Sequence, residues 1–168
     1  MKSNCLYYFI ALMGAEINAD GGRNKYSAIA GELGWRLGQR SDQSKTPKHC
    51  QIIDNHWVAY NHFKHLGVVR HHKPLVATAR DIEEPSSLPD ILREAKELAH
   101  YAGRVLLIPK CKVPMPTDYW LAYSVPTRYG RTKIECNWFS DRPIHLLGGS
   151  PNAQSYFARA SKRSFFRW

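Results

Sequence analysis

The feature that most constrains the fold is a series of short apolar runs, each ending in polar or turn-forming residues. There are six such runs: CLYYFIALMG (5–14), CQIIDN (50–55), PLVATARDIEE (74–84), RVLLIPK (104–110), DYWLAYSVP (118–126) and PIHLLGG (143–149). The apolar residues within most of them are nearly continuous rather than alternating. This pattern predicts strands that are covered on both faces, as in a parallel sheet.

Helical segments separate several of these runs. The clearest covers 87–100, where Ser87 is the expected N-cap, a buried stripe recurs every three to four residues, and Gly103 is the expected stop. We also predict a short helix over 26–33 and a polar loop over 39–49. Strands that alternate with helices indicate an α/β fold, here a single domain spanning all 168 residues.

The charge balance favours an anionic partner. The 24 Lys and Arg residues outnumber the 14 Asp and Glu residues, giving a net charge of +10. Such a surface suits nucleic acid or a small anionic ligand, although positive charge also serves solubility alone. The tail 155–168 is either a polyanion contact or a solvated helix face, and it carries Arg159, Lys162, Arg163 and Arg167.

Cysteine usage indicates a reducing compartment. Cys5, Cys50, Cys111 and Cys136 are scattered without a CxxC pair, so we expect free thiols and a cytoplasmic location. The apolar run 5–13 is too short to cross a bilayer. We interpret it as a first core strand rather than part of a signal peptide, and expect no membrane partner.

Polar residues close the predicted strands, and in parallel sheets these ends meet at one edge, where α/β proteins place their sites. The closing residues are Asp54 with Asn55, Asp81, Lys110, the region of Arg128, and Gly148 with Gly149. Two carboxylates at equivalent strand ends can have different roles: one accepts hydrogen bonds from a ligand, and the other exchanges a proton with it. The alternative is that both aspartates only form turns, which aspartate favours anyway.

Other residues near these ends extend the predicted site. Gly148 and Gly149 would let backbone N–H groups approach an anion where a helix begins near Ser150, although an ordinary tight turn explains them as well. Trp57 and Tyr129 are expected to line the pocket. We expect no metal and no cofactor, because the clustered histidines are interpreted as surface residues of a basic helix: His56, His62, His65, His71 and His72.

Five motifs, IIDNHW, PLVATARDIEE, RVLLIPK, LAYSVPTRYG and IHLLGGSP, follow one another between residues 52 and 154. In this order they resemble the strand ends of the tRNA-guanine transglycosylase superfamily, above all its phage and bacterial DNA-modifying branch, which inserts 7-deazaguanine derivatives. The resemblance implies a (β/α)8 barrel that exchanges a nucleobase in DNA or tRNA through a covalent enzyme–sugar intermediate.

The resemblance also implies roles for single residues. Asp54 would act on the incoming base or its protons, and Asp81 would recognise the base edge. Residues 125–130, with Arg128 and Tyr129, would form part of the substrate pocket, and the two glycines at 148 and 149 would form the turn before the next helix.

The chain departs from the family in three respects. A complete barrel usually needs about 200 residues or more, and this chain has 168. The family's nucleophilic aspartate lies on a later strand, beyond the glycine turn, where this chain has only a short basic tail. The zinc site of the tRNA-acting enzymes has no counterpart in this chain. We therefore predict an incomplete or reduced TIM-barrel-like sheet, whose edges a second copy or a partner subunit could cover. Three functions stay open: base exchange or N-glycosidic cleavage, a non-catalytic nucleotide or nucleic-acid binding module (an accessory subunit or an inhibitor of a host system), and a magnesium-dependent nuclease.

Overall fold

The computed structural model of the chain describes residues 8–11, 35–43, 50–126, 132–139, 144–148, 153 and 156, with the backbone alone for 8–11, 35–37, 136 and 137. Within these residues one parallel sheet runs in chain order. Its strands are β1 (Tyr8–Ala11), β2 (Trp35–Arg40), β3 (Ile52–Asp54), β4 (Val76–Ile82), β5 (Arg104–Pro109), β6 (Trp120–Ser124) and β7 (Ile144–Leu147).

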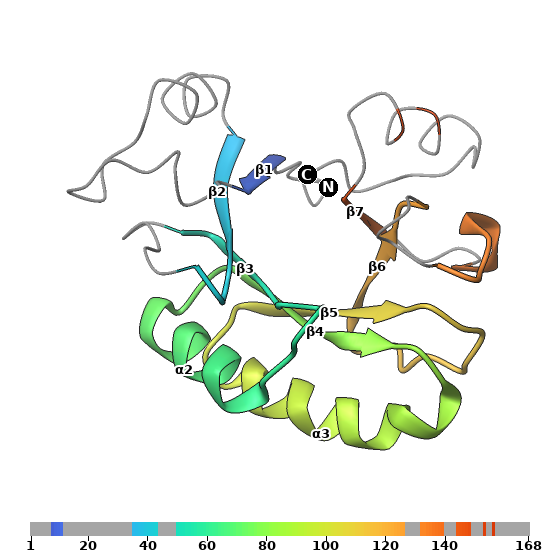
Figure 1. Ribbon diagram of the computed structural model, residues 1–168, viewed down its shortest axis with the longest axis horizontal. Helices are drawn as coiled ribbons and strands as arrows, with labels where there is room; N and C mark the ends of the chain where they lie inside the picture. The colour runs from blue at the N-terminus through green and yellow to red at the C-terminus, as the bar shows by residue number, and fades with distance from the viewer. Residues whose placement is uncertain are drawn as a thin grey trace, which may run out of the picture.

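The sheet is curled, and the helices α2 (His62–His72) and α3 (Leu88–Ala99) lie on its convex side (Figure 1). Each strand pairs with its sequence neighbours, and the described strands β1 and β7 have one neighbour each. The predicted α/β class with a parallel sheet is therefore confirmed. A singly wound, curled sheet of this order has the shape of part of a barrel.

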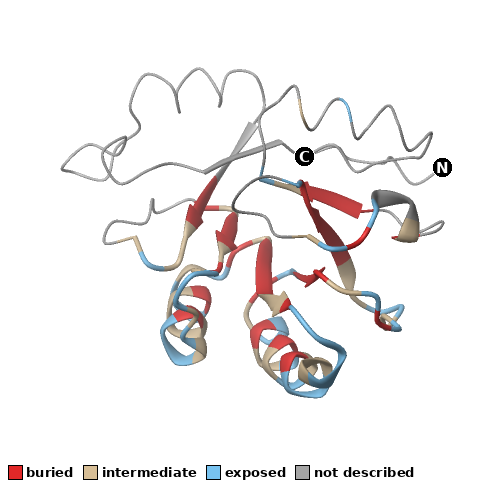
Figure 2. Ribbon diagram, turned by 45° about the vertical axis from the view of Figure 1, so that its right-hand side comes forward, coloured by how far each residue is buried: buried red, intermediate tan, exposed pale blue. Residues whose placement is uncertain are grey.

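The core lies mainly between the sheet and the helices. Figure 2 shows buried residues along the strands and on the sides of the helices that face them. On α3, Ile91, Ala95 and Leu98 are fully buried in the cluster that contains the outward-facing residues of β4 and β5. A smaller apolar cluster covers the inner face of the sheet and consists of Ile52, Val76, Leu106, Ile108 and Ala122. Burial on both faces explains why the strands read as continuous apolar runs.

The helix ends follow local rules in part. Asn61 caps α2, since its side chain accepts from the N–H of Lys64 at 3.0 Å. Lys73 ends the helix with a φ of 44°, in the left-handed region, and donates to the carbonyl of Val69 at 2.8 Å. Ser87 occupies the predicted N-cap position of α3, but its hydroxyl donates to the carbonyl of Glu84 instead of capping the helix.

Two local predictions need correction. The polar loop was predicted to begin at residue 39, yet Gln39 and Arg40 belong to β2 and pair with Ile53 and Asp54 of β3. Strand pairing across the sheet overrides the polar composition of this segment. Gly103 does not end α3, which stops at Ala99.

Gly103 has a different structural role. Its N–H donates to the carbonyl of Pro74, and a Cβ there would meet the carbonyl oxygen of Leu75 at 2.9 Å. Close approach of two backbone segments, rather than helix termination, requires the glycine.

Some predictions fall outside the described residues. These are the helix over 26–33 and all of the basic tail 155–168 except Tyr156. In the part of the chain that is described, none of the helices has the length and apolar character needed to cross a membrane.

Candidate active site

Three polar side chains from neighbouring strands meet at the carboxyl edge of the sheet. Asp54 is the last residue of β3, Asp81 lies near the end of β4, and Lys110 directly follows β5. Lys110 Nζ is 3.3 Å from Asp81 Oδ2, and these side chains are only 4% and 15% exposed. The negative charge of Asp81 also acts on Asp54. The two predicted acids and the predicted lysine therefore share one edge.

Asp54 is held in a network of donors. Its Oδ1 accepts from the Thr78 hydroxyl at 2.7 Å and from the Asn55 N–H at 2.9 Å. Burial nevertheless raises the pKa of Asp54 to about 6, against the hydrogen bond from Thr78, and the charge of Asp81 raises it further. Asp54 can therefore gain or lose a proton near neutral pH, as a general acid or base must.

Asp81 is held differently. Burial raises the pKa of its carboxyl, but the charge of Lys110 and its hydrogen bond oppose that shift. A carboxylate beside a buried ammonium is stabilised in its charged form. The two carboxylates thus have different surroundings, one among neutral donors and one in an ion pair.

Asn55 leaves one acceptor open. Its side chain is 1% exposed, and Nδ2 donates to the carbonyl of Ala79 at 2.7 Å and to Thr78 Oγ1 at 3.1 Å. Its Oδ1 is buried and has no hydrogen-bond partner within the described residues. A buried acceptor of this kind needs a donor from water or a ligand. Asn55 is therefore suited to the substrate-binding role that the sequence predicted.

A break in the regular register of β4 brings Asp81 to the site. Thr78 pairs with Leu106, but the next register partner on β4 is Asp81, opposite Ile108. Ala79 and Ile82 both pack in the cluster that faces the helices. In a regular strand Asp81 would share the face of Ala79, because side chains alternate. The bulge moves Asp81 to the inner face, where it can meet Lys110.

Charged residues that the sequence reasoning missed extend the edge toward β2. Arg40 pairs with Asp54 in the strand register. Its Nε and Nη2 donate to the two carboxylate oxygens of Asp42 at 2.9 and 2.8 Å, and His56 Nε2 lies 3.8 Å from Asp42 Oδ2. The charge of Arg40 partly offsets the raised pKa of Asp54. The pattern that could have identified Arg40 is its place after the apolar residues Trp35 and Leu37.

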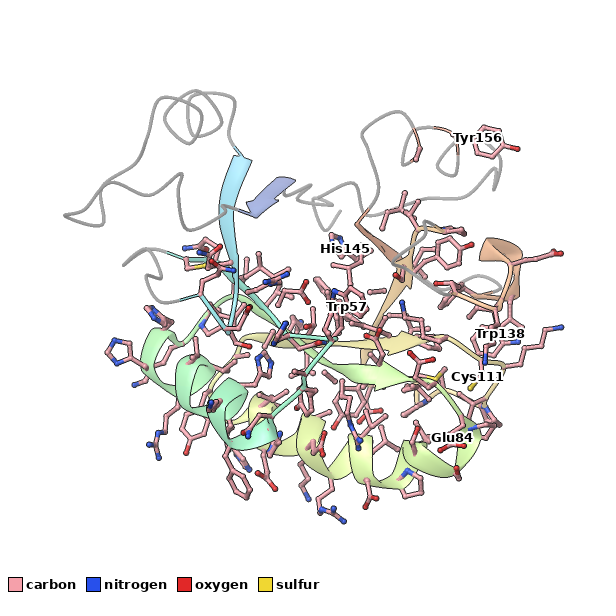
Figure 3. All side chains as sticks on the ribbon, viewed as in Figure 1. Trp57, Glu84, Cys111, Trp138, His145 and Tyr156 are labelled. Carbon is pink, nitrogen blue, oxygen red and sulfur yellow. The ribbon has the colours of Figure 1, made fainter. Side chains whose placement is uncertain are left out.

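The remaining predicted site residues are only partly described. Trp57 is 42% exposed, and Figure 3 shows it and the buried His145 of β7 toward the inner side of the curled sheet. Gly148 follows β7 with a φ of 71° and has open space around the position of a Cβ. Arg128, Tyr129, Gly149 and Ser150 lie outside the described residues. In the described part, no group of three His, Cys, Asp or Glu side chains could hold a metal ion.

The histidines do not all lie on a surface helix as predicted. His56 precedes α2, and His65 within α2 is 1% exposed because it packs against β4. Its Nε2 lies 2.9 Å from the carbonyl oxygen of Thr78. Thr78 and His65 both lie next to the site and were missed. A small hydroxyl residue inside an apolar strand was the available indication for Thr78.

Sequence comparison assigns the chain to a family. The model of DUF6610, a family of unknown function, matches residues 30–163, which is more than half of the chain. The chain therefore belongs to this family. A search among curated proteins finds no similar sequence.

Proposed function

We propose that this member of DUF6610 is a nucleic-acid-associated, transglycosylase-like protein that recognises a nucleobase at the carboxyl ends of its parallel strands. The curled sheet is, in this proposal, an incomplete (β/α) barrel. The observation that carries the proposal is the pair of unlike carboxylates, Asp54 and Asp81, on adjacent strands. The net charge of +10 supports a polyanionic partner.

The surroundings of the two acids support separate roles. Cleavage of a glycosidic bond places negative charge on the departing base nitrogen, and a protonated Asp54 can neutralise that charge by donating its proton. Asp81, charged beside Lys110 at 3.3 Å, accepts hydrogen bonds from N–H groups of the base. Water completes hydrolysis by attacking the sugar carbon, whereas a ring nitrogen of a second base completes exchange by attacking the same carbon. In both cases the carboxylate left on Asp54 takes up the proton that the attacking group loses. Asn55 Oδ1 offers a further acceptor.

Base exchange with labelled guanine or a labelled 7-deazaguanine, on DNA and on tRNA, tests the proposal. We expect incorporation to be lost in Asp54→Asn and Asp81→Asn and kept in the control Asp90→Asn, which changes an exposed acid of α3 that pairs with exposed Arg93. Because Asp54 must be protonated to act as the acid, the rate should fall as pH rises through about 6. Incorporation that survives both site variants would contradict the proposed roles.

A non-catalytic binding module is the second candidate, and the ion pair favours it, since Lys110 neutralises one of the two acids. The same variants separate the candidates in a binding assay with labelled oligonucleotides and mononucleotides. Tight binding that Asp81→Asn weakens, without any turnover by the unmodified chain, would select the binding module over the enzyme.

A further inference from the structure

His65 lies on α2, outside the sheet, yet it contacts the strand that carries Asp81. Its side chain is 1% exposed, and its Nε2 is 2.9 Å from the carbonyl oxygen of Thr78. Because a carbonyl can only accept, Nε2 carries the proton and Nδ1 does not. Nδ1 is buried and has no hydrogen-bond partner among the described residues. The contact to Thr78 therefore fixes one tautomer.

Thr78 connects this contact to the candidate site. Its carbonyl accepts from His65, while its hydroxyl donates to Asp54 Oδ1 at 2.7 Å. The same hydroxyl oxygen accepts from the backbone N–H and the Nδ2 of Asn55. Thr78 is also the last regularly paired residue of β4 before the bulge that turns Asp81 inward.

Two consecutive backbone carbonyls at the bulge accept hydrogen bonds from side chains. The carbonyl of Thr78 accepts from His65 and the carbonyl of Ala79 accepts from Asn55 at 2.7 Å. A bulge disrupts the regular ladder, and buried carbonyls need partners. The next residue, Arg80, reaches Glu94 of α3 at 3.4 Å and lies over the ring of Tyr60. Groups from both helices and the β3 end thus hold this short segment.

We propose that His65 is a positioning residue of the candidate active site: it fixes the peptide at the start of the β4 bulge and thereby sets the orientations of Asp54 and Asp81. The inference rests on the proposed function for its catalytic meaning, while the orientation itself can be measured without turnover. His65 touches neither carboxylate. It acts through Thr78.

The donor is constant over the physiological pH range. Burial lowers the pKa of His65 to about 4, its hydrogen bond to Thr78 opposes this, and the charge of His62 lowers it further. The ring of Tyr60 also faces it, with centroids 5.9 Å apart. His65 therefore stays neutral where Asp54, which faces Asp81 and Arg40, changes its charge.

Two substitutions of similar shape test the donor. The amide Nε2 of His65→Gln can occupy the place of the imidazole Nε2 and donate to Thr78, whereas His65→Met fills the same space without a donor. The measurement is the titration of the Asp54 carboxyl carbon by NMR, with Thr78→Val as the reference for complete loss of the hydroxyl.

We expect His65→Gln to titrate like the unmodified chain and His65→Met to titrate like Thr78→Val, with the pKa of Asp54 higher by roughly one pH unit. A Met variant that titrates like the unmodified chain, or a Gln variant that shifts as far as Met, overturns the proposal. If His65→Met does not fold, His65→Asn, whose amide is too short to reach Thr78, takes its place. A proton found on Nδ1 of the unmodified chain by ring-nitrogen NMR also overturns it.

Turnover separates this inference from the proposed function. The base-exchange assay is run at about pH 5, where Asp54 is protonated in every variant, so that only its orientation differs. There His65→Met should lower kcat by about tenfold and His65→Gln should restore it. If the unmodified chain shows no exchange but the titrations follow the expected order, the proposed function fails and the positioning role stands. Normal exchange in His65→Met refutes the positioning role alone.

Discussion

Replacing Asp54 with Asn should raise the free energy of unfolding above that of the unmodified chain, and this gain should be larger at alkaline pH than at acidic pH. Burial raises the pKa of Asp54 from 3.8 to about 6. A group whose folded-state pKa is raised contributes stability that is fully present below about pH 3.8 and is lost as pH rises through about 6. Since one pH unit corresponds to about 1.4 kcal/mol, the charged carboxylate lowers the free energy of unfolding by at most about 3 kcal/mol. Asparagine has no charge and escapes this effect.

Urea unfolding at pH 4.5 and pH 8 measures the difference. Asp54 is already partly ionised in the unfolded chain at pH 4.5, so the gain of Asp54→Asn over the unmodified chain should grow by about 2 kcal/mol between the two values. Asp90→Asn, at an exposed acid, should show no such growth. An Asp54→Asn gain that is the same at both pH values would show that Asp54 is not an acid held out of water, and the proposed proton donor would be lost with it.

Two further substitutions test the structure around the site. Lys110→Met should lower the free energy of unfolding at pH 7 by about 3–5 kcal/mol, because it leaves Asp81 buried without its ammonium. Thermal unfolding would show this loss, and adding Asp81→Asn should recover most of it. A double variant that recovers no stability would mean that the ion pair is not the cause. Lys73→Gly should raise the free energy of unfolding by roughly 1 kcal/mol, since Lys73 has a φ of 44° at the end of α2; a loss of stability in urea unfolding would contradict the left-handed conformation.

The site places constraints on stability as well as on chemistry. The acid pair, the open acceptor of Asn55 and the bulge of β4 all keep polar groups among buried residues. Such arrangements commonly lower stability where function requires them. The expected gain of Asp54→Asn in stability, together with its expected loss of base exchange, would be a direct measure of that conflict.

The predicted strands could be read from the sequence because their apolar residues are continuous. Each of the six predicted runs contains one strand of the sheet, namely β1, β3, β4, β5, β6 and β7. Strands buried on both faces leave little room for polar residues. The sequence also predicted that Asp54, Asp81 and Lys110 lie at one edge of the sheet. The reason is that each of them closes a predicted strand, and parallel strands end at the same edge. β2 was not predicted at all. Its last two residues, Gln39 and Arg40, are polar and belong to the strand through pairing with β3.

The sequence by itself thus determined the parallel α/β class and the position of Asp54 and Asp81 at the ends of strands. It could do so because apolar continuity and strand-end position are local properties. Only the tertiary structure decided that Asp81 faces inward, since its side is set by a bulge between Thr78 and Asp81 and not by alternation along β4. It alone also decided that His65 is buried against Thr78 rather than exposed. Both depend on contacts between segments far apart in the chain, which no local pattern of residues encodes.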